Sequence, residues 1–247
     1  LAVLMTLDDK PFKFYGAFAS IGVYGLPQVK APQYSSSLIW LENSMDKHQF
    51  NILSAGWSVE PSLYGDSQTR LTTAWTNDGF HGTGCHDVVC PGFVQVSSEI
   101  PVGTPIGPLS ILHGQQYAVD TYIYLDQPTK NWWLILGKDK KAIGYWPTNI
   151  FTTLSQYATQ LQFGGVVGYS GTDRPPMGSG LPAELGAGSA CYFKRVQYVN
   201  EQNQLLDLKP SDTFEHETFP RCYEIGNYVE TRDVERNMFY FGGDGHC

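Results

Sequence analysis

The chain alternates apolar and polar positions over short runs that are separated by glycine, proline, asparagine and aspartate. A period of two places successive side chains on opposite faces of a β-strand, and the separating residues favour turns. Alternation at Phe18–Val23 predicts a strand, and so do strand-length runs bounded by turn residues at Leu38–Leu41, Phe50–Val59, Arg70–Trp75, Phe93–Val96, Tyr117–Tyr124 and Trp132–Leu136. Lys194–Val199 and Gln204–Leu208 flank a polar turn at 200–203 and predict a β-hairpin.

One segment has a helical period. After Pro147, apolar residues recur at helical spacing, at Ile150, Leu154, Tyr157, Ala158 and Leu161. Thr148 or Asn149 is suited to cap it, so we expect one short helix at about 148–160. Short strands with a single helix predict an all-β fold, an antiparallel β-sandwich of two bent sheets. We find no repeat or linker, and we expect one domain over 1–247.

Composition narrows the class of protein further. Aromatic residues make up 14% of the 247 residues and charged residues only 16%, which excludes a disordered chain. The formal net charge is −8 and the largest basic cluster is 138–141, so a nucleic-acid partner is not expected. No apolar run approaches the length that crosses a bilayer, so no membrane partner is expected either. The loosest stretch, 168–188, predicts a long loop that borders a site.

The five cysteines indicate the compartment. The economical pairing joins Cys85 to Cys90 and Cys222 to Cys247, and it leaves Cys191 as a buried free thiol. Metal ligation by Cys85, His86 and Cys90 is the rival interpretation, but structural zinc sites usually have two closely spaced pairs. Disulfides predict an oxidising compartment, so we expect a secreted or vacuolar protein. The chain begins at Leu1 without a signal segment, and we interpret it as a mature chain.

A search for catalytic motifs leaves few candidates. The chain lacks the Gly-X-Ser-X-Gly turn of serine hydrolases and any phosphate-binding glycine loop. The segment Glu215-His216-Glu217 is better explained as an exposed charged strand than as a metal site, because His216 would point away from both glutamates. We expect neither metal nor cofactor. Paired carboxylates remain an option, and composition alone does not select a pair among 24 acidic residues.

Longer strings carry a resemblance over nearly the whole chain. They are LIW (38–40), AGWSVEPSLYGD (55–66), WTNDG (75–79), TGCHDVVCPGFVQ (83–95), NWW (131–133), GYWP (144–147), FGGVV (163–167) and MGSG (177–180). In this order they resemble the plant neprosin family, which is named for a proline-directed peptidase of pitcher-plant fluid.

The resemblance implies a fold and a chemistry. It implies a secreted antiparallel β-sandwich similar to the fungal glutamic peptidases called eqolisins, with the two disulfides given above. Peptidase members of the neprosin family use two glutamates across a cleft, at acid pH, to cut after proline. One glutamate activates water and the other polarises or protonates the scissile amide. Eqolisins use a glutamine with a glutamate.

Both family glutamates are replaced in this chain. The first lies directly before Ala-Gly-Trp, where this sequence has Ser54, and the second lies before an aromatic residue and Gly-Gly, where it has Gln162. Glycine follows two residues after each, at Gly56 and Gly164, and these four positions are our candidates for lining the cleft. The glycines either admit a ligand backbone or relieve crowding in a bent sheet. Glu60 shares strand parity with Ser54 but lies roughly 20 Å along the strand, too far to replace a glutamate there.

These losses predict the function. A serine hydroxyl is no base at acid pH, and a glutamine amide donates hydrogen bonds without shuttling protons. We therefore expect a non-catalytic protein, for binding, defence or storage, that retains a cleft for a peptide or carbohydrate ligand. One alternative is an acid-active, proline-directed endopeptidase in which Gln162 works with another acid. Another alternative is a lectin-like module. The sequence does not predict the oligomeric state.

Overall fold

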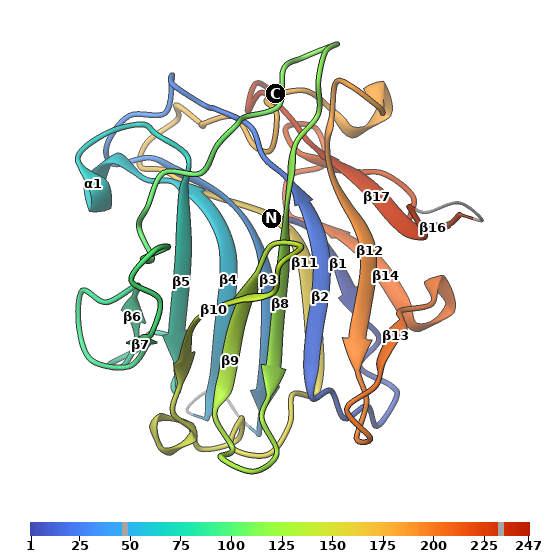
Figure 1. The fold of residues 1–247 in the computed structure, drawn as a ribbon. Coiled ribbons are helices and arrows are strands. Elements are labelled where there is room, and N and C mark those ends of the chain that lie inside the picture. Colours follow the sequence, from blue (N-terminus) through green and yellow to red (C-terminus); the bar gives the residue numbers. More distant parts are fainter. Residues whose placement is uncertain (46–48, 232–234) are drawn as a thin grey trace.

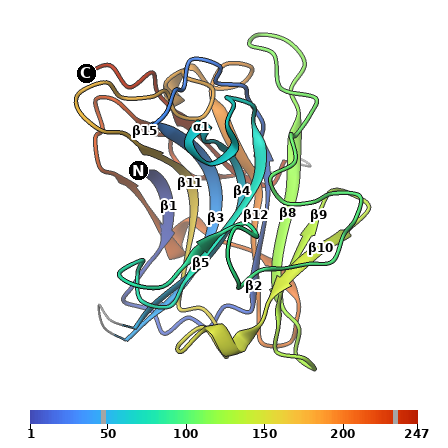
Figure 2. The ribbon, with the colours of Figure 1, turned by 90° about the vertical axis from the view of Figure 1, so that its left-hand side faces the viewer.

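The computed structural model describes residues 1–45, 49–231 and 235–247, and the chain folds into two antiparallel sheets (Figure 1). Within these ranges it has one short α-helix, α1 (Pro61–Tyr64), and three 3-10 turns, η1 (Thr148–Ile150), η2 (Ala183–Leu185) and η3 (Pro210–Asp212). Figure 2 shows the two sheets as separate layers. The predicted all-β sandwich is confirmed.

The first sheet has seven strands. In spatial order they are β14 (Thr213–Glu217), β1 (Ala2–Thr6), β11 (Gln160–Gly168), β3 (Tyr34–Ser44), β4 (Phe50–Val59), β5 (Arg70–Thr76) and β6 (Cys85–His86). Strands β3 and β4 form a long hairpin and are the longest in the structure. The predicted strand character of 215–217 is confirmed, because β14 pairs with β1.

The second sheet has ten strands. Its main path is β15 (Glu224–Ile225), β17 (Asn237–Gly242), β12 (Cys191–Val199), β2 (Gly16–Gly22), β8 (Ala118–Leu125), β9 (Trp132–Leu136), β10 (Lys141–Trp146) and β7 (Val94–Gln95). The two remaining strands, β13 (Leu205–Asp207) and β16 (Val229–Glu230), pair with β12 and β17. Pairing of β12 with β13 confirms the predicted hairpin.

Large aromatic side chains fill the space between the sheets. They come from both layers and are fully buried, at Trp57, Trp132, Trp146, Phe163, Phe193, Phe239 and Phe241. Their burial explains why a chain with so many aromatic residues folds around one core, since each buries a large apolar area. In the first sheet, odd-numbered residues of β3 and β4 face this core, as Ile39, Leu41 and Leu53 show. The even-numbered residues therefore face the opposite side of the sheet.

The predicted helix at about 148–160 is wrong beyond its first turn. Only η1 is helical, and β11 begins at Gln160. The reason is Asn51, a buried residue of β4, whose side-chain oxygen accepts hydrogen bonds from the backbone N–H groups of Thr152, Thr153 and Leu154. These N–H groups are satisfied without helical hydrogen bonds, so the chain remains irregular there.

Candidate functional site

The outer face of the seven-stranded sheet, turned away from the second sheet, carries a cleft. Its volume is about 500 Å³, and a cavity of that size is typical for binding sites. Figure 2 shows the curvature of the strands on this side. The cleft is lined by Leu1, Tyr34, Ser36, Leu38, Trp40, Glu42, Phe50, Ile52, Ser54, Glu60, Thr72, Thr73, Ala74, Phe80, His86, Gln162 and Val166.

Ser54 and Gln162 lie in one row across this cleft. Gln162 of β11 is the register partner of Trp40 on β3, and Trp40 is in turn the partner of Ser54 on β4. Two strand spacings separate the backbones of Ser54 and Gln162, or about 10 Å, with the indole of Trp40 between them. The row continues through Ala74 to His86. Ser54 and Gln162, the two positions that the sequence analysis singled out, therefore face the same cleft.

A carboxylate that the sequence did not single out lies beside Gln162. The Gln162 amide donates a hydrogen bond of 2.8 Å to the Glu42 carboxyl, and Glu42 is only 5% exposed. Burial raises the pKa of Glu42 to about 7, the hydrogen bond from Gln162 opposes the rise, and Asp8 adds to it. Glu42 is thus a buried acid that is mostly protonated at acid pH. It shares the parity of Trp40, but only the strand register brings it to Gln162.

Glu60 lies in the same cleft, beyond the end of β4. Its backbone carbonyl accepts hydrogen bonds from Leu63 and Tyr64 in α1, while its side chain does not cap that helix. Burial raises the pKa of Glu60, His86 opposes the rise, and Asp87 adds to it. Glu60 thus adds a second carboxyl group to the cleft lining, six residues after Ser54 in the sequence.

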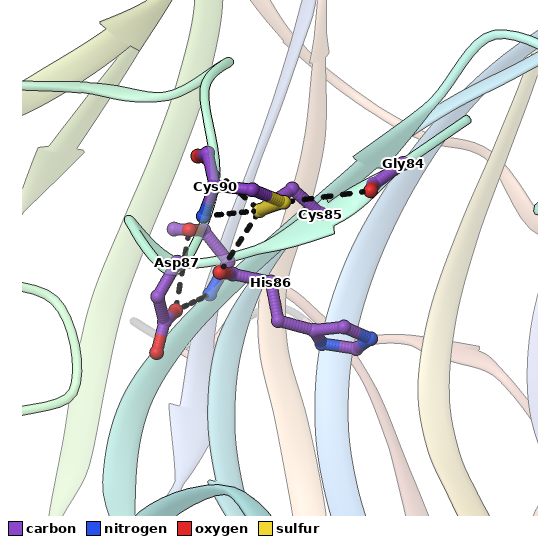
Figure 3. The surroundings of a disulfide bond; sticks show 6 residues. Gly84, Cys85, His86, Asp87 and Cys90 are labelled. Carbon is purple, nitrogen blue, oxygen red and sulfur yellow. Dashed lines mark hydrogen bonds between the residues drawn. A yellow bond between two sulfur atoms is a disulfide. The ribbon is translucent and has the colours of Figure 1, made fainter.

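A disulfide loop positions His86 at the edge of the cleft. Cys85 pairs with Cys90, and Figure 3 shows His86 and Asp87 turned to opposite sides. The Asp87 carboxylate accepts hydrogen bonds of 2.7 Å from the Thr73 N–H and from the Tyr64 hydroxyl. Burial raises the pKa of Asp87, and these donors oppose that rise. Asp87 thereby anchors the loop to β5, and the His86 ring stacks on Phe80 with centroids 6.2 Å apart.

The other cysteine predictions are confirmed. Cys222 pairs with Cys247, and Cys191 is free and buried. The metal interpretation of Cys85 and Cys90 is wrong, because their sulfurs are bonded to each other. Among the residues that the structure describes, no cluster of three or more histidine, cysteine or acidic side chains has the arrangement of a metal site.

The two candidate glycines do not line the cleft. A Cβ at Gly56 would lie 2.1 Å from the Ser37 carbonyl oxygen, and one at Gly164 would lie 2.3 Å from the Ala2 carbonyl oxygen. These glycines therefore relieve crowding between neighbouring strands of a bent sheet and do not make room for a ligand backbone. The loop 168–188 also contributes no described residue to the cleft lining. Its Met177 packs in the core and pairs with Gly243 instead.

Comparison with known proteins identifies the family of this chain. A sequence model of the neprosin family matches residues 31–244. The chain therefore contains a neprosin domain and belongs to the neprosin family. Scytalido-glutamic peptidase in complex with a peptide-based transition-state analogue is similar in structure. Its TM-score is 0.45 at 10% identity, and the match covers 97% of this chain and 95% of that one.

SCP-B, an eqolisin-family peptidase in complex with the tripeptide Ala-Ile-His, is also similar. Its TM-score is 0.41 at 8% identity, and the match covers 97% of this chain and 94% of the other.

No helix within the described ranges is long and apolar enough to cross a membrane.

Proposed function

We propose that this chain binds peptides in the cleft and does not carry out the two-glutamate hydrolysis of its family. One observation carries the proposal: Ser54 and Gln162, the residues that the sequence analysis expects at the family's glutamate positions, lie in one row across the cleft. The apolar floor, which includes Leu38, Trp40 and Ile52, provides contact area for an extended ligand.

The neighbouring acid does not restore acid chemistry. A general base must be ionised at the working pH, whereas Glu42 has a pKa of about 7 and is largely protonated below pH 6. Ser54 supplies no proton acceptor there, since a hydroxyl needs a base beside it. At acid pH, therefore, none of Ser54, Gln162 and Glu42 supplies a base to activate water in the Ser54–Gln162 row.

A second candidate function is hydrolysis near neutral pH. The observation in its favour is the 2.8 Å contact of Gln162 with Glu42 in a cleft that both line. Above pH 7, an ionised Glu42 would accept the proton of an attacking water, and Gln162 would donate its second N–H to the scissile carbonyl oxygen. Such an enzyme would lose activity towards acid pH, unlike the acid-active alternative expected from the sequence.

The disulfides support a location in an oxidising compartment. Two disulfides in one chain are typical of an oxidising environment. A secreted or vacuolar protein, with a role in defence or storage, is therefore part of the proposal.

Binding and cleavage of the same peptides test both candidates. Acetylated, proline-containing octapeptides are followed by fluorescence anisotropy and mass spectrometry from pH 2.5 to 9. We expect binding without cleavage, and weaker binding by Trp40→Ala than by Trp133→Ala, a half-buried tryptophan of the other sheet. Acid-pH cleavage that Gln162→Ala abolishes would overturn the proposal. Cleavage that rises with a pKa near 7 and disappears in Glu42→Gln would establish the second candidate, and glycan binding without peptide binding would contradict both.

A further inference from the structure

One carboxylate in the cleft lacks a partner. The Glu60 carboxylate is half-buried and makes neither a hydrogen bond nor an ion pair with any residue that the structure describes. The other acids around it differ in this respect. Asp87 accepts hydrogen bonds from Thr73 and Tyr64, and Asp66 pairs with Arg70. A partly desolvated carboxylate without a donor is unfavourable, and a ligand that supplies one recovers that energy.

The side chains near Glu60 are suited to a cation. Tyr34 is close enough for Glu60 to raise its pKa together with burial, and the stacked Phe80 and His86 rings line the same cavity. Aromatic faces next to a carboxylate attract guanidinium and ammonium groups through cation–π and ionic contacts. His86 is the one histidine of the cleft lining, and it opposes the rise in the pKa of Glu60.

No lysine or arginine side chain occupies this position. The described cleft lining includes Glu42 and Glu60 but neither Lys nor Arg. Arg70, on the adjacent strand β5, is bound to Asp66 and to the carbonyl oxygen of Gly103. The lining also includes Leu1, whose α-amino group donates a hydrogen bond to the Thr218 hydroxyl. The side chains of the cleft are complementary in charge to a basic ligand, in a chain whose formal net charge is −8.

From this complementarity we infer that the ligand is an extended peptide with a basic side chain, arginine above lysine, whose cation binds Glu60 beside Tyr34 and His86. The inference rests on the proposed peptide-binding function and names its ligand class. Arginine is favoured because its planar guanidinium forms two parallel hydrogen bonds with a carboxylate while stacking on a ring. Glu60 lies just beyond the end of β4, whereas His86 continues the Ser54 row through Ala74, so the basic residue binds at the part of the cleft that Glu60 and His86 share.

A peptide series tests the inference without altering the protein. A single arginine is moved through an acetylated, amidated decapeptide of alanine, proline and phenylalanine, and each peptide has a counterpart with citrulline, which is isosteric and neutral. Anisotropy at pH 7.5 gives Kd for each pair. At the best position we expect the arginine peptide to bind about tenfold more tightly than its citrulline counterpart, as one desolvated ion pair would produce.

Two variants then assign the effect to one carboxylate. Glu60→Gln keeps the shape and removes the charge, and it should abolish the arginine preference. Glu184→Gln removes an exposed charge outside the cleft and should leave the preference unchanged. Equal binding of arginine and citrulline peptides overturns this inference alone, and so does a preference that persists in Glu60→Gln. Absence of binding by every peptide overturns the proposed function together with the inference.

Discussion

A glutamate lies at each end of the cleft, and the two differ in burial and in hydrogen bonding. Glu42 is buried and hydrogen-bonded to Gln162, whereas Glu60 is half-buried and unpaired within the described residues. Both have raised pKa values, with burial as the first cause. The difference teaches that an acid inside a cleft is not by itself a catalytic acid. Glu42 is internally satisfied, while Glu60 is left to bind something from outside.

The largest expected effect concerns Glu42 and the pH dependence of stability. The pKa of Glu42 is about 7 in the folded protein, against an ordinary value of 4.5, so its contribution is fully present below pH 4.5 and is lost as pH rises through 7. The free energy of unfolding of Glu42→Gln, taken as a difference from wild type, should therefore rise by about 3 kcal/mol from pH 4 to pH 8. Urea denaturation at several pH values measures this. A difference that stays constant with pH would show that Glu42 ionises normally.

Removal of the donor to Glu42 should have the next largest effect. Gln162→Ala leaves a buried carboxylate unpaired, which at pH 8 should cost about 2–3 kcal/mol. The loss should be smaller at pH 4, where Glu42 is neutral. Gln197→Ala is the matched control, because Gln197 is a buried glutamine that donates to a carboxylate outside the cleft, that of Asp207. Equal losses in the two variants at both pH values would remove the special status of the Gln162–Glu42 contact.

The Glu60 end depends on the disulfide loop. Cys85→Ser with Cys90→Ser should lower the free energy of unfolding by about 2 kcal/mol, the chain-entropy value for so short a loop. The double variant should also weaken the arginine preference, since His86 and Asp87 lie within the loop. It should leave the pH signature of Glu42 intact. Denaturation and anisotropy on one preparation check both, and loss of the Glu42 signature would mean that the two ends are not independent.

The smallest effect on stability is expected for Glu60→Gln. Because burial raises the pKa of Glu60, its ionised form opposes folding, and the neutral variant should be slightly more stable at pH 7.5, by less than about 1 kcal/mol. Thermal unfolding with and without peptide measures it. A clear destabilisation would reveal an internal partner for Glu60 and would remove the contrast with Glu42.

Local pattern was enough to predict much of the fold. The strand-length runs at β4 and β9 predicted strands with the observed ends, and the cysteine spacing predicted both disulfides. Local pattern failed where a distant side chain decides the structure. The side-chain oxygen of Asn51 accepts hydrogen bonds from three backbone N–H groups of the segment predicted to be helical, which is about a hundred residues away in sequence. No local period reports such a contact.

The candidate site shows the same limit. Ser54 and Gln162 were identified from the strings around them, and the structure places both in one cleft. Glu42 was missed because its contact with Gln162 depends on the register of β3 against β11, 120 residues apart in sequence. Gly56 and Gly164 were placed on the cleft by parity alone. Carbonyl oxygens of neighbouring strands explain them, and that crowding is visible only in three dimensions.

The most direct measurement restores the missing carboxylates. The double variant Ser54→Glu with Gln162→Glu is assayed beside the parent on proline-containing peptides from pH 2.5 to 9, after circular dichroism confirms that it folds. We predict cleavage after proline at acid pH in the double variant and none in the parent, which would show an intact cleft that lacks the family chemistry. Acid-pH cleavage by the parent, or a folded double variant that neither binds nor cleaves the peptides, would contradict the central claim.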